Sequence, residues 1–388
     1  MNTLNIAKKL GLLAVSTAFL FVSACKKDPQ KIANPGPTFS LDKFETELKN
    51  SMEPSGAKAW AYIINQNGLY ARGKAYGDAR TTADGQLNFT LNKKINLASV
   101  SKFLTAIAVM QLLEERKINI NARVAPWLPP SWSRGTGVDD LTFADLLSHR
   151  SGMSSVNTNF SNTLGYTGLR TFVATGVTNP AKPRNYLNAN FALFRVIIPS
   201  LWRGLPDAPD ISSNLDSLTT ETMYIKFMQD RVFEPIGING ANCEPEARAS
   251  CTLYYANTDN NNSSNGLYYG SWTSMAGGGG YFLSSMELAR VLAYFRHTEI
   301  LMSKEQRQIM EENRFGFNQL DDNREIHGSY YSKNGSIINN GQGIVSEIVL
   351  FPNGIEVVTV FNTQGMVFAG GVTATSSAIY DAYNKSWE

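Results

Sequence analysis

The pattern of apolar and polar positions divides the chain into two strand-forming ends and a helical middle. Residues 60–65 and 69–75 are predicted to be strands joined by the turn signal Gln66-Asn67-Gly68. From Phe103 onward the residues are apolar on nearly every helical face, which predicts a central, buried helix. Beyond about residue 320 the pattern predicts further strands and a last helix, at residues 336–339, 344–351, 355–361 and 373–383.

These elements predict an α+β fold. One antiparallel sheet, built from both ends of the chain and flanked by terminal helices, is expected to carry a mostly helical insertion over roughly residues 97–320. Ser40, followed by early acidic residues, is expected to cap the first of these helices. The chain has 388 residues, 43% of them apolar, which is enough for a single large domain over residues 40–388.

The N-terminal segment is predicted to be a targeting signal. Lys8 and Lys9 precede an apolar run over residues 10–22 that is short for a bilayer span. The ending Val-Ser-Ala-Cys25 resembles a bacterial lipobox, whose cysteine is lipidated. We therefore expect a signal peptide over residues 1–24, a tether over 25–39, and an exported lipoprotein held to the membrane by lipid, periplasmic or at the cell surface. The alternative is an ordinary signal peptide with an incidental cysteine.

Charge and cysteine content limit the remaining classes of partner. There are 35 basic and 33 acidic residues, and this net charge of +2 gives no reason to expect a nucleic-acid partner. The three histidines lie far apart in the sequence, so no metal site is expected and no cofactor is implied.

In an oxidising compartment, Cys243 and Cys251 are expected to form a local disulfide; the alternative is two buried thiols.

The sequence Ser-x-x-Lys occurs four times, at Ser23, Ser40, Ser55 and Ser99. Only Ser99 opens a long buried helix, on which Lys102 shares its face and can reach its hydroxyl. A serine hydroxyl is a poor nucleophile until a base takes its proton. A buried lysine with a lowered pKa can assist in this. Ser99 and Lys102 are therefore the candidate catalytic pair.

Three segments carry a family resemblance. Residues 95–106 (INLASVSKFLTA) resemble the nucleophile segment of the class C β-lactamase and penicillin-binding family. Residues 141–152 (LTFADLLSHRSG) and 233–237 (FEPIG) resemble two further signatures of the same family, and the likeness runs from about residue 40 to the C-terminal end. The resemblance implies a β-lactamase/transpeptidase-like fold and hydrolysis through an acyl-enzyme on Ser99.

The family's second motif, Tyr-x-Asn, has two candidates. Tyr186-Leu-Asn188 leads into an apolar helix, whereas Tyr255-Ala-Asn257 leads into an Asn-rich loop. Context favours Tyr186, which the resemblance makes the general base or its relay, with Asn188 bonding the acyl side chain of the substrate. The alternative is that Tyr186 is an ordinary core aromatic residue.

The third motif is matched by Lys333-Asn334-Gly335-Ser336 on a predicted strand. By resemblance these residues bind substrate, and the backbone N–H groups of Ser99 and Ser336 form the oxyanion hole. Asn334 stands where a hydroxyl residue is usual, which leaves substrate preference open. His149 is expected to be structural, bonding the end of its own helix, and His327 to be a satisfied strand residue.

The expected reaction is two-step acyl transfer to water, with Lys102 or Tyr186 as the base. The substrate is left open between a β-lactam, a D-amino-acid peptide and an ester. The rival interpretation is a non-catalytic lipoprotein that uses the same fold to bind cell-wall peptide or a partner protein.

Overall fold

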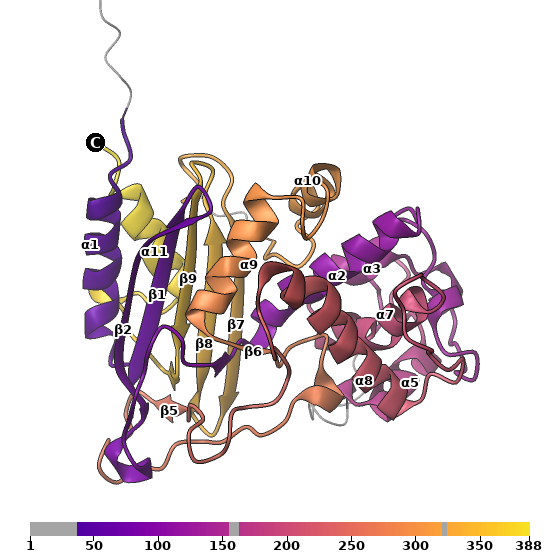
Figure 1. Ribbon diagram of the computed structural model, residues 1–388, viewed down its shortest axis with the longest axis horizontal. Coiled ribbons are helices and arrows are strands. Elements are labelled where there is room, and N and C mark those ends of the chain that lie inside the picture. The colour runs from indigo at the N-terminus through magenta and orange to yellow at the C-terminus, as the bar shows by residue number, and fades with distance from the viewer. Residues whose placement is uncertain (1–36, 155–162, 320–323) are drawn as a thin grey trace, which may run out of the picture. The chain divides into compact units, whose positions relative to one another are not determined.

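Strands from the two ends of the chain lie side by side in one sheet (Figure 1), in which β1 and β9 pair antiparallel. The computed structural model describes residues 37–154, 163–319 and 324–388. The expected signal peptide, Cys25 and nearly all of the tether lie outside these residues. None of the described helices is long and apolar enough to cross a membrane.

The main strands follow the order β7, β8, β9, β1, β2 across the sheet. Their bounds are β1 (Ala59–Gln66), β2 (Leu69–Arg80), β7 (Tyr331–Asn339), β8 (Gln342–Leu350) and β9 (Ile355–Phe361). Trp60 near the start of the domain lies opposite Phe361 near its end. The predicted hairpin is confirmed: Asn67 and Gly68 both have positive φ, as a tight turn between β1 and β2 requires.

Helices cover both faces of the sheet. On one face α1 (Leu41–Met52) packs against α11 (Thr375–Asn384). Phe44, Leu48 and Met52 of α1 recur every four residues and are all buried there. On the other face α9 (Ser285–His297) lies over β1 and β9 (Figure 1). Since both faces are covered, seven of the eight residues of β1 are buried rather than alternating with exposed ones.

The middle of the chain is mostly helical, as expected. The central helix α2 (Ser101–Glu115) is buried at every residue from Ser101 to Met110, which confirms the prediction of a central helix. The other helices are α3 (Phe143–Leu147), α5 (Tyr166–Thr175), α6 (Asn188–Ala192), α7 (Phe194–Trp202), α8 (Ser217–Phe227) and α10 (Lys304–Glu312). Short strands complete the fold: β3 (Leu87–Asn88), β4 (Ile95–Asn96), β5 (Tyr255–Ala256), β6 (Phe282–Leu283) and β10 (Thr363–Gln364).

The disulfide expected between Cys243 and Cys251 is not formed, and both residues are free, buried thiols. Cys243 lies in the main apolar core, whereas Cys251 belongs to a separate small cluster with Leu253 and Tyr255. The two sulfur atoms are enclosed by different groups of side chains. Their short separation in sequence therefore does not bring them together.

Candidate active site

Ser99 lies on a sharp turn between β4 and α2. The turn is the one-turn helix η3 (Ala98–Val100), and Ala98 holds a left-handed φ of 47°. The Asn96 side chain stabilises this conformation by accepting a hydrogen bond of 2.7 Å from the Ala98 N–H. The turn presents the Ser99 hydroxyl at the N-terminal end of the buried helix, where negative charge is favoured.

Lys102 lies one helical turn after Ser99, as the spacing predicts. Its Nζ donates hydrogen bonds to Ser99 Oγ (2.9 Å), to Asn188 Oδ1 (2.7 Å) and to the Gly278 carbonyl. The side chain is fully buried, and this burial lowers the pKa of the Lys102 amine to about 7. Near neutral pH a large fraction of Lys102 is therefore uncharged and able to accept a proton.

Tyr186 also contacts the Ser99 hydroxyl. Its Oη donates a hydrogen bond of 2.8 Å to Ser99 Oγ. The amines of Lys102 and Lys333 lie 4.9 and 5.4 Å from the centre of its ring. The rival candidate Tyr255 is buried elsewhere, where its hydroxyl bonds the Thr81 N–H and Asp84. The geometry therefore brings Tyr186, and not Tyr255, to Ser99.

His149 has a role that the sequence interpretation missed. Its N–H bonds the end of its own helix, as expected, by donating to the Leu146 carbonyl (3.2 Å), and the residue also bonds the segment that carries Tyr186. Its Nδ1 accepts a hydrogen bond from the Leu187 N–H (3.3 Å), and its carbonyl accepts one from the Asn185 N–H (2.8 Å). The two ring centres of His149 and Tyr186 are 4.4 Å apart. Burial above all, with the nearby charges of Lys102 and Lys333, lowers the pKa of His149 to about 2, so the ring is neutral.

Lys333 comes from β7, an edge strand of the sheet. Its Nζ donates to Asn318 Oδ1 (3.0 Å) and to the Asn334 carbonyl (2.8 Å). Burial lowers the pKa of Lys333 to about 8, with a smaller opposing effect from Tyr186. Asn318 was not anticipated, because it lies outside all the motifs. Nothing in the sequence pattern points to this contact.

Gly335 allows β7 to approach the turn at residues 97–100 that carries Ser99, here called the nucleophile turn. A Cβ atom at this position would lie 2.3 Å from the Leu97 carbonyl oxygen and 2.9 Å from the Ser99 nitrogen. Any larger residue would push the strand and the turn apart. The glycine therefore sets the close distance between the two backbones that face the Ser99 hydroxyl.

The backbone of β7 also directs an N–H group into the site. The carbonyls of Ser332 and Asn334 point away from β8, since they accept hydrogen bonds from the Asn318 N–H and from Lys333 Nζ. Backbone groups of alternate residues share one edge of a strand, so the Ser336 N–H points to this same open edge. Together with the Ser99 N–H it provides two donors that can hold an oxyanion.

These groups line a cavity of about 100 Å³. The lining combines polar side chains with apolar side chains and glycines. The residues are Ala98, Ser99, Leu164, Tyr186, Asn188, Trp272, Gly278, Gly279, Ser336 and Ile337. In the described part of the chain, no three His, Cys, Asp or Glu side chains gather closely enough to share a metal ion.

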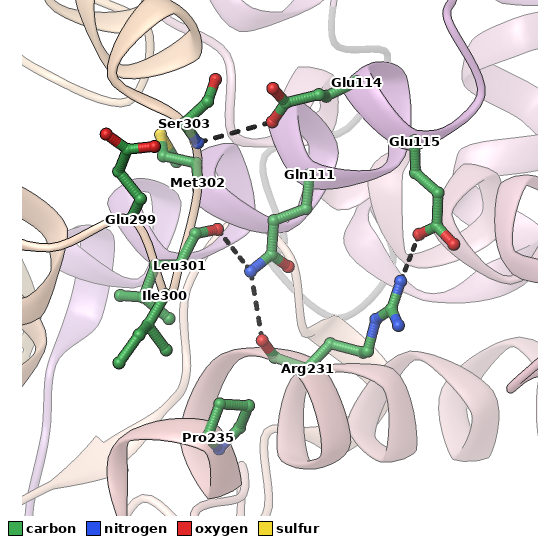
Figure 2. A pocket seen from close by; sticks show the side chains of 10 residues that line it. All are labelled: Gln111, Glu114, Glu115, Arg231, Pro235, Glu299, Ile300, Leu301, Met302 and Ser303. Carbon is green, nitrogen blue, oxygen red and sulfur yellow. Dashed lines mark hydrogen bonds and ion pairs between the residues drawn. The ribbon is translucent and has the colours of Figure 1, made fainter.

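A larger hollow of about 460 Å³ lies at the other end of α2, roughly 20 Å away by the helical rise (Figure 2). Three of its ten lining residues are glutamates, and Glu115 forms an ion pair with Arg231. Its one hydroxyl residue, Ser303, has no lysine, histidine or tyrosine beside it among the lining residues. The hollow lacks the grouping of serine, lysine and tyrosine that surrounds the smaller cavity.

Known proteins with a related fold include hydrolases and penicillin-binding proteins. Residues 52–382 match the family model described as Beta-lactamase. The chain resembles the octameric penicillin-binding protein homologue from Pyrococcus abyssi, with a TM-score of 0.65 and 18% identity over 88% of this chain and 76% of that one. It also resembles a class C β-lactamase from Rhodobacter sphaeroides (TM-score 0.61, 16% identity, 88% and 97% covered) and a D-stereospecific amidohydrolase from Streptomyces (0.60, 16%, 89% and 98%). These likenesses confirm the predicted β-lactamase/transpeptidase-like fold.

Proposed function

The chain belongs to the β-lactamase family, and we propose that within this family of serine hydrolases it acts by forming an acyl-enzyme at Ser99. One observation carries the proposal: the Lys102 amine and the Tyr186 hydroxyl both lie within 2.9 Å of Ser99 Oγ. A protein that only bound a ligand would have no need of two proton-transfer groups at a single hydroxyl.

In the first step Ser99 Oγ attacks the carbonyl carbon of an amide or ester while its proton passes to Tyr186 or Lys102. The N–H groups of Ser99 and Ser336 stabilise the oxyanion that forms. The bond to the leaving group then breaks, and the leaving group takes up the proton. In the second step water attacks the acyl-enzyme and releases the acid. The proposed substrate is a β-lactam, a D-amino-acid peptide or an ester.

The experiment that tests this function is covalent labelling. The full chain is treated with a fluorophosphonate and with a fluorescent penicillin, and the labelled peptide is identified by mass spectrometry. We expect an adduct on Ser99 that is lost in Ser99→Ala. The matched control is Ser55→Ala, since Ser55 also begins a Ser-x-x-Lys sequence but lies beside β1. An unlabelled wild type, or equal labelling of Ser99→Ala, would contradict the proposal.

We propose as well that the chain is an exported bacterial lipoprotein carrying lipid on Cys25. The support is the sequence alone: two lysines, an apolar run and a lipobox-like ending. Metabolic labelling with an alkyne fatty acid should mark the wild type and Cys251→Ala but not Cys25→Ala. Equal labelling of the Cys25 variant would contradict this anchor.

A further inference from the structure

One wall of the Ser99 cavity is made of backbone alone. It belongs to residues 276–280, an alanine followed by four glycines, here called the glycine segment. Gly278 and Gly279 both line the cavity. A Cβ atom at Gly278 would lie 2.7 Å from the Asn188 carbonyl oxygen, so the segment packs directly against the start of α6. Because these positions carry no side chain, only their N–H and carbonyl groups can act on the site.

The Gly278 carbonyl helps to orient the Lys102 amine. Three oxygen atoms surround Lys102 Nζ: Ser99 Oγ, Asn188 Oδ1 and the Gly278 carbonyl oxygen. An uncharged amine has two N–H donors and one lone pair. The amide oxygen of Asn188 and the carbonyl of Gly278 can only accept, so they take both donors and leave the lone pair directed at Ser99 Oγ. The position of the Gly278 carbonyl therefore decides how well Lys102 can accept the serine proton.

Two side chains hold the glycine segment in place. Thr105 on α2 donates from Oγ1 to the Gly277 carbonyl (2.8 Å). Arg195 on α7 donates from Nη1 to the Ala276 carbonyl (3.0 Å) and from Nη2 to the Leu164 carbonyl (2.7 Å). Leu164 is another of the residues that line the cavity. Arg195 thus ties two parts of the cavity wall together, although it is not itself a lining residue.

The burial of Arg195 is costly, and the protein does not compensate for it with a carboxylate. The side chain is fully buried, and burial lowers its pKa to about 10, against an opposing effect from Glu221, so it is charged at neutral pH. Among the described residues no carboxylate is close enough to form an ion pair with it, and its Nε has no hydrogen-bond acceptor. A buried charge with an unused donor lowers stability. Its presence therefore indicates a role in arranging the site.

We propose that Arg195 is a positioning residue, which holds the Gly278 carbonyl where that carbonyl orients the Lys102 amine. The proposal rests on the function proposed above and adds to it a residue that lies outside all three motifs. Since Arg195 does not line the cavity, its loss should impair proton transfer rather than ligand binding.

The test follows the covalent labelling of Ser99 by a fluorophosphonate, so it does not depend on knowing the substrate. The maximal labelling rate, kinact, and the half-saturating concentration, KI, are measured over a series of pH values. Wild type is compared with Arg195→Met, which keeps the length of the side chain but removes its donors, and with Arg195→Lys. Thr105→Val loosens the same segment without any change at Arg195.

Arg307→Met is the matched control. Arg307 also donates to two backbone carbonyls, those of Phe295 (2.8 Å) and Thr298 (3.0 Å), but these lie at the end of α9. Circular dichroism at the assay temperature shows whether each variant is folded. If Arg195→Met does not fold, Arg195→Lys decides the outcome, because one amine cannot replace two guanidinium nitrogens at both carbonyls.

We expect Arg195→Met to lower kinact about tenfold with little change in KI, because the base is less well oriented. The acid limb of its pH profile should move to lower pH, since the charged amine of Lys102 loses part of a stabilising acceptor. Arg195→Lys should show a smaller loss of kinact. Thr105→Val should show the same two changes as Arg195→Met, and Arg307→Met should show neither.

Two results would overturn the role of Arg195 while leaving the proposed function intact. One is a folded Arg195→Met, or failing that Arg195→Lys, with the kinact and pH profile of wild type. The other is a loss confined to KI. A wild type that does not react with the fluorophosphonate would instead overturn the proposed function itself.

Discussion

The amine of Lys102 lies over the ring of Tyr186, 4.9 Å from its centre, so the two possible bases are in contact with each other beside Ser99. Both donate to the same oxygen atom, at 2.9 and 2.8 Å. A proton leaving Ser99 can therefore pass to either group without any movement of the backbone. In the proposed mechanism the two side chains therefore act as one proton-transfer unit.

The first prediction concerns this unit. Lys102→Met and Tyr186→Phe should each lower the rate of acylation by about 10²–10⁴-fold, the usual contribution of a general base. Because the two groups act together, the double variant should lose little more than the worse single variant. Acylation is followed by stopped-flow with an activated ester. Tyr70→Phe, at an exposed position on β2, serves as the control. Fully multiplicative losses would contradict a shared unit.

The second prediction is a bell-shaped pH dependence of kcat/KM. Burial lowers the pKa of Lys102 to about 7, so below this pH the amine is protonated and cannot accept the Ser99 proton. Burial lowers the pKa of Lys333 to about 8, so above this pH the site loses a positive charge. The value of kcat/KM should thus rise up to about pH 7 and fall beyond about pH 8. The two apparent pKa values of this profile belong to the coupled groups together. A Lys333→Met variant should lose the alkaline fall. A kcat/KM that does not change between pH 6 and 7 would contradict the role of Lys102 as proton acceptor.

The third prediction assigns His149 a positioning role. His149→Ala removes a buried ring beside Tyr186 and leaves the Leu187 N–H without its acceptor. We expect the free energy of unfolding to fall by about 2–4 kcal/mol. We also expect kcat to fall, because Tyr186 loses its support. His327→Ala is the control, since that ring stacks on Trp387 (4.4 Å). Lower stability with unchanged kcat would show that His149 is only structural.

The fourth prediction concerns Gly335. In Gly335→Ala the added methyl group meets the Leu97 carbonyl and the Ser99 nitrogen, both on the nucleophile turn. The free energy of unfolding of the variant should be about 2–3 kcal/mol lower than that of wild type. Its acylation should also be slower, because the two oxyanion donors move apart. Asn339→Ala, at the exposed end of the same strand, should behave like wild type. An active Gly335→Ala variant would contradict the proposed oxyanion hole.

Much of the fold could be predicted because its signals are local. The Asn67-Gly68 turn and the apolar run after Phe103 each specify one element within a few residues. Tyr186 could be preferred to Tyr255 for a similar reason, since only Tyr186 is followed by an apolar helical segment. In these cases the residues that determine the structure are neighbours in the sequence.

The remaining features depend on contacts between distant segments. Asn318 holds Lys333 across a stretch of chain with no motif, and the segment that carries Tyr186 is joined to His149 by the hydrogen bond from the Asn185 N–H to the His149 carbonyl. The disulfide prediction was wrong for the same reason. The spacing of Cys243 and Cys251 cannot reveal that their sulfur atoms enter different apolar clusters. Sequence patterns therefore predict helices and strands more readily than the tertiary contacts between them.

The pairing of β1 with β9 has a consequence for how the protein is made. Trp60 has Tyr76 as its partner on one side and Phe361 on the other, so one edge of the β1–β2 hairpin lacks its neighbouring strand until almost the whole chain has been synthesised. The nucleophile turn packs against β7, which is also synthesised late. Neither the sheet nor the turn that carries Ser99 can therefore reach its final arrangement before β7 and β9 are available to pair.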